Sequence, residues 1–69
     1  MLPAMPKGSY DRTDYEYEIV KDINYGWAVR LKIDGIYHES GNSYRTKMLA
    51  AEAVHDEARV IIRDLRLKP

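Results

Sequence analysis

The sequence predicts an α+β domain in which a three-stranded antiparallel sheet packs on one C-terminal helix. Apolar and polar residues alternate over residues 15–20 and again over residues 27–33, which is typical of half-buried strands. After residue 46 the apolar residues recur at spacings of three and four, which is typical of an amphipathic helix. With a third strand from residue 36, these patterns predict a βββα domain over residues 15–69 with strand order 1-2-3.

The composition limits what such a domain can be. Its 69 residues include no cysteine and two histidines, so neither a disulfide framework nor an ordinary structural zinc site is expected. Eleven basic and eleven acidic residues cancel to zero net charge, so binding to nucleic acid would need a local basic patch. We therefore expect a single domain held together by packing, with no metal and no cofactor.

Residues 1–14 precede the first alternating stretch and contain Pro3, Pro6 and Gly8 with few apolar side chains. A segment of this kind buries too little surface to offset the entropy lost on ordering, so we predict a disordered tail. It lacks the apolar core of a secretory signal, and no apolar run in the chain approaches the ~20 residues of a membrane helix. We expect a cytoplasmic protein that does not bind a membrane.

Charge selects the register of the first two strands. If the loop between them is Asp22–Gly26, acidic residues face basic residues on one side of the hairpin, and apolar residues face each other on the opposite side. A shift of one residue would set the charged side of one strand against the apolar side of the other. The predicted opposite pairs are Lys21–Trp27, Glu18–Arg30, Tyr17–Leu31 and Glu16–Lys32.

The third strand follows the dipeptide Asp34-Gly35, which tolerates the positive φ angles of a two-residue type I′ turn. We expect this strand to run from Ile36 to about Ser40 and to end in a polar loop. The predicted opposite pairs are Ile36–Ile33, His38–Leu31 and Glu39–Arg30.

One amphipathic helix of roughly 20 residues is predicted from Thr46, which is a natural N-cap residue. Basic residues near its C-terminus complement the helix dipole. We expect Trp27 to cap the core near the C-terminus of this helix. The predicted core stripe consists of Met48, Ala51, Val54, His55, Ala58, Ile61, Ile62 and Leu65.

The start of this helix is a candidate anion site. Arg45, Thr46 and Lys47 place two cations and a hydroxyl beside free backbone N–H groups. The alternative is that both basic side chains extend into solvent, or that Lys47 pairs with Asp14 or Glu39.

Aromatic and imidazole side chains offer two further candidates. Tyr25, Trp27 and Tyr37 could form an aromatic surface that stacks on bases or binds a peptide, although Trp27 is expected mainly in the core. His38 and His55 could approach each other beneath the helix, but their spacing matches no metal-binding motif, so we predict no metal site.

Catalytic patterns are absent from the sequence. It has no cysteine nucleophile, no serine in a strand–turn–helix elbow and no glycine-rich phosphate loop. A domain this thin also has little room for a pocket that excludes water. We predict that the protein is not an enzyme.

Two surfaces of the predicted sheet lack cover. The face opposite the helix is open, because the tail is too polar to cover it. The first strand is an edge without proline, so a second copy or an extended peptide could pair with it, unless Glu16, Glu18 and Lys21 keep it monomeric. We therefore expect a monomer or a weak homodimer formed through an edge strand. The residues expected at the interaction surface are Glu16, Glu18, Tyr25 and Tyr37.

Three stretches carry a resemblance to a known family: Gly26-Trp27-Ala28-Val29-Arg30, Ile33-Asp34-Gly35, and Tyr44-Arg45-Thr46-Lys47 followed by Ala50, Ala51 and Ala53. Their order resembles the arm-type DNA-binding domain of phage tyrosine integrases, in which three strands lead into one helix. The layout is also similar to short uncharacterised bacterial βββα proteins of Burkholderia-type bacteria. The integrase resemblance implies that the open sheet face enters the DNA major groove, with Arg30 and Lys32 as contact residues.

These observations support two hypotheses for function. The first is a non-catalytic interaction or accessory protein that binds another macromolecule through the open sheet face or an edge strand. The second is a DNA-binding module similar to the integrase arm domain. Because Glu16 and Glu18 lie opposite Lys32 and Arg30, they compete with phosphate for these cations, and a protein is the more expected partner.

Overall fold

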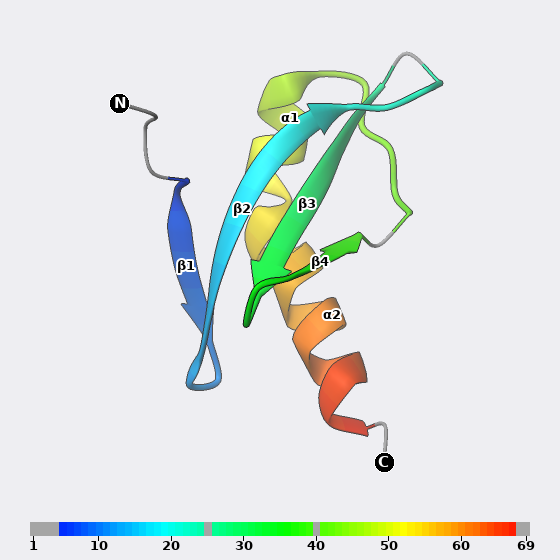
Figure 1. Ribbon diagram of the computed structural model, residues 1–69. Helices are drawn as coiled ribbons and strands as arrows, with labels where there is room; N and C mark the ends of the chain where they lie inside the picture. Colours follow the sequence, from blue (N-terminus) through cyan, green and yellow to red (C-terminus); the bar gives the residue numbers. More distant parts are fainter. Residues whose placement is uncertain (1–4, 25, 40, 68–69) are drawn as a thin grey trace.

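In the computed structural model, which describes residues 5–24, 26–39 and 41–67, one antiparallel sheet is covered on one face by two helices (Figure 1). The strand order is β1-β2-β3-β4, and the strands are β1 (Lys7–Tyr10), β2 (Thr13–Lys21), β3 (Trp27–Ile33) and β4 (Ile36–Glu39). The helices are α1 (Lys47–Glu52) and α2 (Val54–Leu67). The α+β class and the helical cover are confirmed, whereas the prediction of three strands and one helix is wrong.

The additional strand, β1, lies within the segment 1–14 that we assigned to a tail. It pairs antiparallel with the start of β2, and Gly8 lies opposite Tyr15. A Cβ atom at Gly8 would collide with the Tyr15 ring, so glycine lets this ring lie across β1. The prediction of a tail is wrong for residues 7–10, because backbone pairing with β2 and the packing of Tyr10 against the core hold β1. Residues 1–4 of the predicted tail lie outside the described residues.

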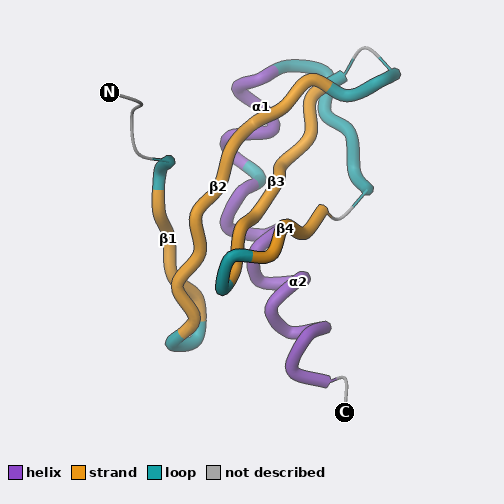
Figure 2. Tube along the Cα trace, in the orientation of Figure 1, coloured by secondary structure: helices purple, strands orange, loops and turns teal. Residues whose placement is uncertain are grey.

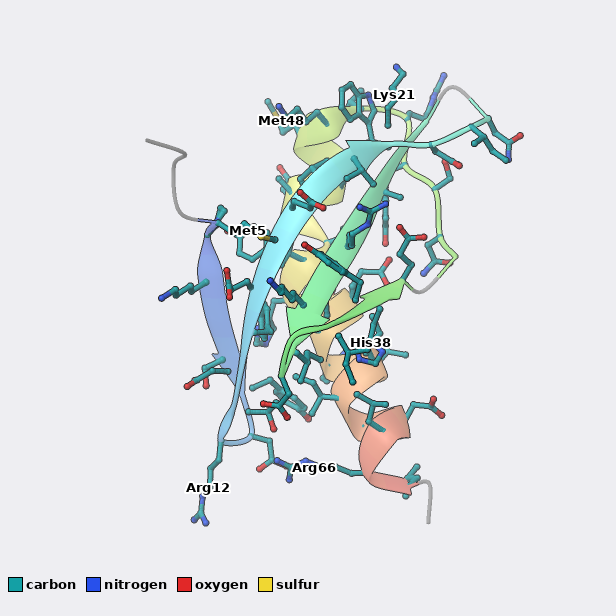
Figure 3. The ribbon with its side chains drawn as sticks, viewed as in Figure 1. Met5, Arg12, Lys21, His38, Met48 and Arg66 are labelled. Atoms are coloured by element: carbon teal, nitrogen blue, oxygen red, sulfur yellow. The ribbon has the colours of Figure 1, made fainter. Side chains whose placement is uncertain are left out.

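The turn between β1 and β2 is held by the last turn of α2. Asp11 and Arg12 both have positive φ angles, 48° and 67°, as a two-residue hairpin turn requires. The Arg66 guanidinium donates to the Asp11 carboxylate at 2.6 Å, to the Asp11 carbonyl at 2.5 Å and to Thr13 Oγ1 at 2.9 Å. Figure 3 shows Arg66 lying toward this turn while Arg12 points away from the molecule.

The predicted registers are confirmed in both remaining hairpins. In the first of them the acidic residues Glu16 and Glu18 oppose basic residues, and Tyr17 and Ile19 oppose apolar residues, as expected. Asp34 and Gly35 adopt positive φ angles of 51° and 80° in the turn before β4. The pairs are Lys21–Trp27, Glu18–Arg30, Tyr17–Leu31, Glu16–Lys32, Ile33–Ile36, Leu31–His38 and Arg30–Glu39. Ser40, where we expected the third predicted strand to end, lies outside the described residues.

The predicted single helix is interrupted at Ala53. Its N–H is shared between the carbonyls of Leu49, at 3.2 Å, and Ala50, at 3.1 Å, which tightens the last turn of α1. The predicted N-cap is confirmed, because Thr46 Oγ1 accepts a hydrogen bond from the Leu49 N–H at 3.1 Å. Figure 2 shows both helices on the same side of the sheet.

The core stripe of the helices is displaced from the predicted one. Four predicted members, Met48, Ala51, His55 and Leu65, are exposed, whereas Ala50 and Glu57 are buried. The reason is that a four-residue spacing from Ala50 through Val54, Ala58 and Ile62 sets the centre of the stripe; Met48, Ala51 and His55 fall outside it, and Leu65 lies in the last turn of α2. The buried residues are Tyr15, Val29, Leu31, Ile33, Ala50, Val54, Glu57, Ala58, Ile61 and Ile62.

Trp27 packs against the core, as predicted, but at the other end of the helical layer. It exchanges two backbone hydrogen bonds with Tyr44, at 2.8 and 2.7 Å, and α1 begins three residues after Tyr44. The start of β3 therefore lies beside the start of the helices and not beside their end.

The buried position of Leu31 gives a direct test of this fold. Leu31→Ala is expected to lower the free energy of unfolding by about 2–5 kcal/mol, because it opens a cavity where no side-chain surface was exposed. Leu67→Ala, on a side chain that is mostly exposed, is the matched control and should change it by less than ~0.5 kcal/mol. Urea denaturation measures both values, and equal effects of the two variants would contradict the assigned core.

Candidate functional site

The open face of the sheet carries a ladder of charges. On each strand every second side chain points away from the helices, and the registers align these side chains in rows across the sheet. The rows are Lys7–Glu16–Lys32–Tyr37 and Glu18–Arg30–Glu39. Because positive and negative side chains alternate along both rows, the face has no strong charge of one sign.

Arg30 lies at the centre of this ladder and is engaged on both sides. Its Nη1 donates to Glu18 Oε1 at 3.2 Å, and its Nε donates to Glu39 Oε1 at 3.1 Å. The hydrogen bond to Glu39 raises the pKa of the guanidinium, and the negative charges of Glu39 and Glu18 raise it further. A phosphate group would have to displace two carboxylates to reach this side chain.

Tyr37 is the aromatic member of the ladder. The Arg30 guanidinium and the Lys32 ammonium each lie 5.5 Å from its ring centroid, within the range of a cation–π contact. Both basic residues predicted for DNA contact therefore cluster around one exposed ring. Tyr25, the other predicted member of an aromatic surface, lies outside the described residues.

A hollow of about 550 Å³ lies at one end of the open face, over β1, β2 and the turn after β3. Its lining mixes two ammonium groups with three carboxylates, so no charge of one sign dominates it. The lining residues are Lys7, Gly8, Ser9, Asp14, Tyr15, Glu16, Lys32 and Asp34.

Two residues of the candidate anion site at the start of α1 make contacts within the protein. The Thr46 hydroxyl caps the helix. The Lys47 ammonium lies 5.8 Å from the Trp27 ring centroid, and Lys21 lies 4.6 Å from the same centroid. The structure thus places Trp27 within cation–π range of two lysines, and Arg45 beside them is exposed.

The two histidines lie at opposite edges of the sheet. His55 meets the ring of Tyr10, from β1, edge to face at a centroid distance of 6.1 Å. His38 lies on β4, which is the other edge strand. In the described part of the chain, no three side chains of the metal-ligating types gather into a cation site.

Sequence reasoning missed a buried carboxylate on α2. Glu57 is only 3% exposed, and its Oε1 accepts hydrogen bonds from the Tyr44 hydroxyl at 2.5 Å and from Asn42 Nδ2 at 3.2 Å. Burial raises the pKa of Tyr44 to about 12, and the hydrogen bond to Glu57 contributes to the shift. The signal was present, because Glu57 stands at helical spacing between Val54 and Ile61 on the apolar stripe.

Apolar surface is exposed on the edge strand β4. Ile36 is 62% exposed although it lies on the helix-covered face, directly opposite the buried Ile33. We call the two residues of β4 on this face, Ile36 and His38, the β4 flank. Figure 3 shows His38 on the side of β4 that faces α2.

Comparisons with known proteins give no match: no family model, no curated protein and no solved structure matches this chain. Within the described residues, neither helix is long and apolar enough to cross a membrane.

The burial of Tyr44 and its hydrogen bond to Glu57, which raise its pKa, predict a response to alkaline pH. The pKa of Tyr44 is about 12 in the folded protein and ~10 in an unfolded chain, so protonated Tyr44 favours the folded state. This contribution to the free energy of unfolding is complete below pH ~10. The effect is lost as the pH rises toward 12. Between these values the free energy of unfolding should fall less steeply for Tyr44→Phe than for the wild type.

Below pH 10, Tyr44→Phe should itself lower the free energy of unfolding by about 1–3 kcal/mol, because Glu57 stays buried with one donor fewer. Urea denaturation across this pH range measures both effects. Tyr37→Phe, on an exposed ring, is the control and should follow the wild type. If the slope of Tyr44→Phe equals that of the wild type, ionisation of Tyr44 is not what lowers the free energy of unfolding in this range.

Proposed function

We propose that this chain is a small cytoplasmic, non-catalytic interaction protein that binds another protein through the β4 edge and the β4 flank. The observation that carries the proposal is the exposure of Ile36, together with Tyr37, on the edge strand of the sheet. Apolar side chains that line an uncovered strand are typical of sites where an extended partner adds a strand.

The edge itself supplies the second half of such a site. An edge strand presents unpaired N–H and C=O groups along one side, and β4 is the last strand of the sheet. Backbone groups give affinity to an added strand, and the apolar side chains beside them give selectivity. Tyr37, a predicted interaction residue, lies on the same strand and is half exposed.

The opposite edge is less favourable, because the exposed side chains of β1 are Lys7 and Ser9, which are polar. Because β1 pairs with the first part of β2, Glu16 lies opposite Lys7 on an inner strand, although we expected it on an edge strand. Glu18 lies on the open face in an ion pair with Arg30, so its charge is already balanced.

The open face also favours a protein partner over DNA. Arg30 has two carboxylate partners, and Lys32 lies over Tyr37. Binding to a phosphate backbone draws its affinity from free cations, and here each contact with DNA would first break a contact within the protein. The DNA-binding module suggested by the integrase resemblance is the second candidate function.

The proposed site is tested by placing a charge on the β4 flank. Immobilised wild-type chain should recover a partner protein from a cell extract, and Ile36→Lys should recover roughly tenfold less or worse, because an ammonium would be desolvated on binding. Met48→Lys is the matched control, since Met48 is 71% exposed on α1, away from β4, and should bind as the wild type does. Equal recovery by all three chains would contradict the assignment.

A gel shift distinguishes the two candidate functions. At low salt the wild-type chain is expected to leave duplex DNA unshifted, because its open face has no free cluster of cations. Binding that falls steeply with salt and is lost in Arg30→Ala or Lys32→Ala would instead support the DNA-binding module.

A further inference from the structure

The backbone of the sheet determines which groups of β4 are available to a partner. Trp27 exchanges its N–H and C=O hydrogen bonds with Tyr44, on the side of β3 where β4 lies. In an antiparallel sheet, alternate residues of a strand direct these groups to alternate sides. The odd-numbered residues of β3 therefore direct their backbone polar groups toward β4.

The same alternation fixes the orientation of each residue in β4. Ile36 and His38 oppose the odd-numbered residues Ile33 and Leu31, so their backbone groups point inward to β3. Tyr37 and Glu39 consequently point their N–H and C=O groups outward. The free edge thus offers two donors and two acceptors in a regular array.

This array is self-complementary. If a second copy lies antiparallel with the two-fold axis at His38, Tyr37 of each copy lies opposite Glu39 of the other. All outward N–H and C=O groups of Tyr37 and Glu39 then form hydrogen bonds. His38 of one copy faces His38 of the other at the two-fold axis. An axis at Tyr37 would pair only Tyr37 with itself and would place Glu39 opposite the turn at Gly35.

Charge favours the same arrangement. Glu39 of the second copy would approach the Tyr37 ring, beside which the Lys32 ammonium lies 5.5 Å from the centroid. The carboxylate thus meets a cation that forms no ion pair within the described residues, whereas Arg30 keeps Glu18 and the Glu39 of its own chain. Because the net charge of the chain is zero, no overall repulsion opposes association.

We propose that the occupant of the β4 edge is a second copy of this chain, paired antiparallel about His38 to form a sheet that continues across both copies. This inference rests on the proposed function, since it names the partner of the same site. The contact uses one four-residue strand from each copy, so the interface falls in the small class below about 1,200 Å² and the dimer dissociates on dilution.

The register is tested with cysteine variants of the full chain, which contains no native cysteine. Across an antiparallel pair that is not hydrogen-bonded, the Cα atoms lie ~4.5 Å apart, so His38→Cys fits the geometry of a disulfide. In this register Tyr37 of one copy is offset by two residues from Tyr37 of the other, so their Cα atoms lie farther apart than the ~7 Å that a disulfide can span. Under mild oxidation His38→Cys should form covalent dimers at least roughly tenfold faster than Tyr37→Cys.

Sedimentation velocity over a range of concentrations tests the association itself. The wild type should show a reversible monomer–dimer equilibrium, and Tyr37→Pro should be monomeric with an unchanged circular dichroism spectrum. Proline removes an outward N–H without removing a bond to β3. Cross-linking that is faster through Tyr37→Cys would overturn the His38-centred register.

A wild type that stays monomeric up to its solubility limit would overturn the dimer. The proposed function would survive that result if the chain still recovers a different protein in a manner sensitive to Ile36→Lys. If neither association nor such recovery is found, both proposals fail.

Discussion

The packing of α2 on the two central strands is the contact on which the rest of the structure depends. Leu31 and Val29 of β3 meet Ile62 and Ala58 of α2, and all four side chains are almost completely buried. The molecule extends only 18 Å along its shortest axis, as expected for one sheet and one helical layer. A single helical layer covers one face of the four-stranded sheet and leaves the other face open, and the outer sides of β1 and β4 remain edges.

The open face and the β4 edge differ in whether their exposed side chains have partners within the protein. On the open face each charge has a neighbour of opposite sign, so the face is satisfied without a partner. At the opposite edge, Arg66 holds the β1–β2 turn against α2. The β4 flank has no equivalent cover within the described residues, and Ile36 remains exposed there. This asymmetry favours the β4 edge as the binding site.

Much of the fold could be predicted because its signals are local. Alternation located β2 and β3, opposite charges such as Glu18 and Arg30 set their register, and Asp34-Gly35 set the next turn. The strand β1 could not be predicted in this way, since its pairing depends on a contact between Gly8 and Tyr15 that neither residue signals alone. The candidate site was harder still. Both outer strands are edges, and which of them exposes apolar side chains depends on where α2 lies, which is a tertiary property.

The central claim, that α2 protects the middle of the sheet and leaves the β4 edge open, is tested most directly by amide hydrogen exchange in dilute, monomeric solution. The account predicts slow exchange at Arg30 and Lys32, which bond to β2, and fast exchange at Tyr37 and Glu39, whose N–H groups point outward. Exchange at Tyr37 and Glu39 as slow as that at Arg30, or fast exchange throughout β3, would contradict it.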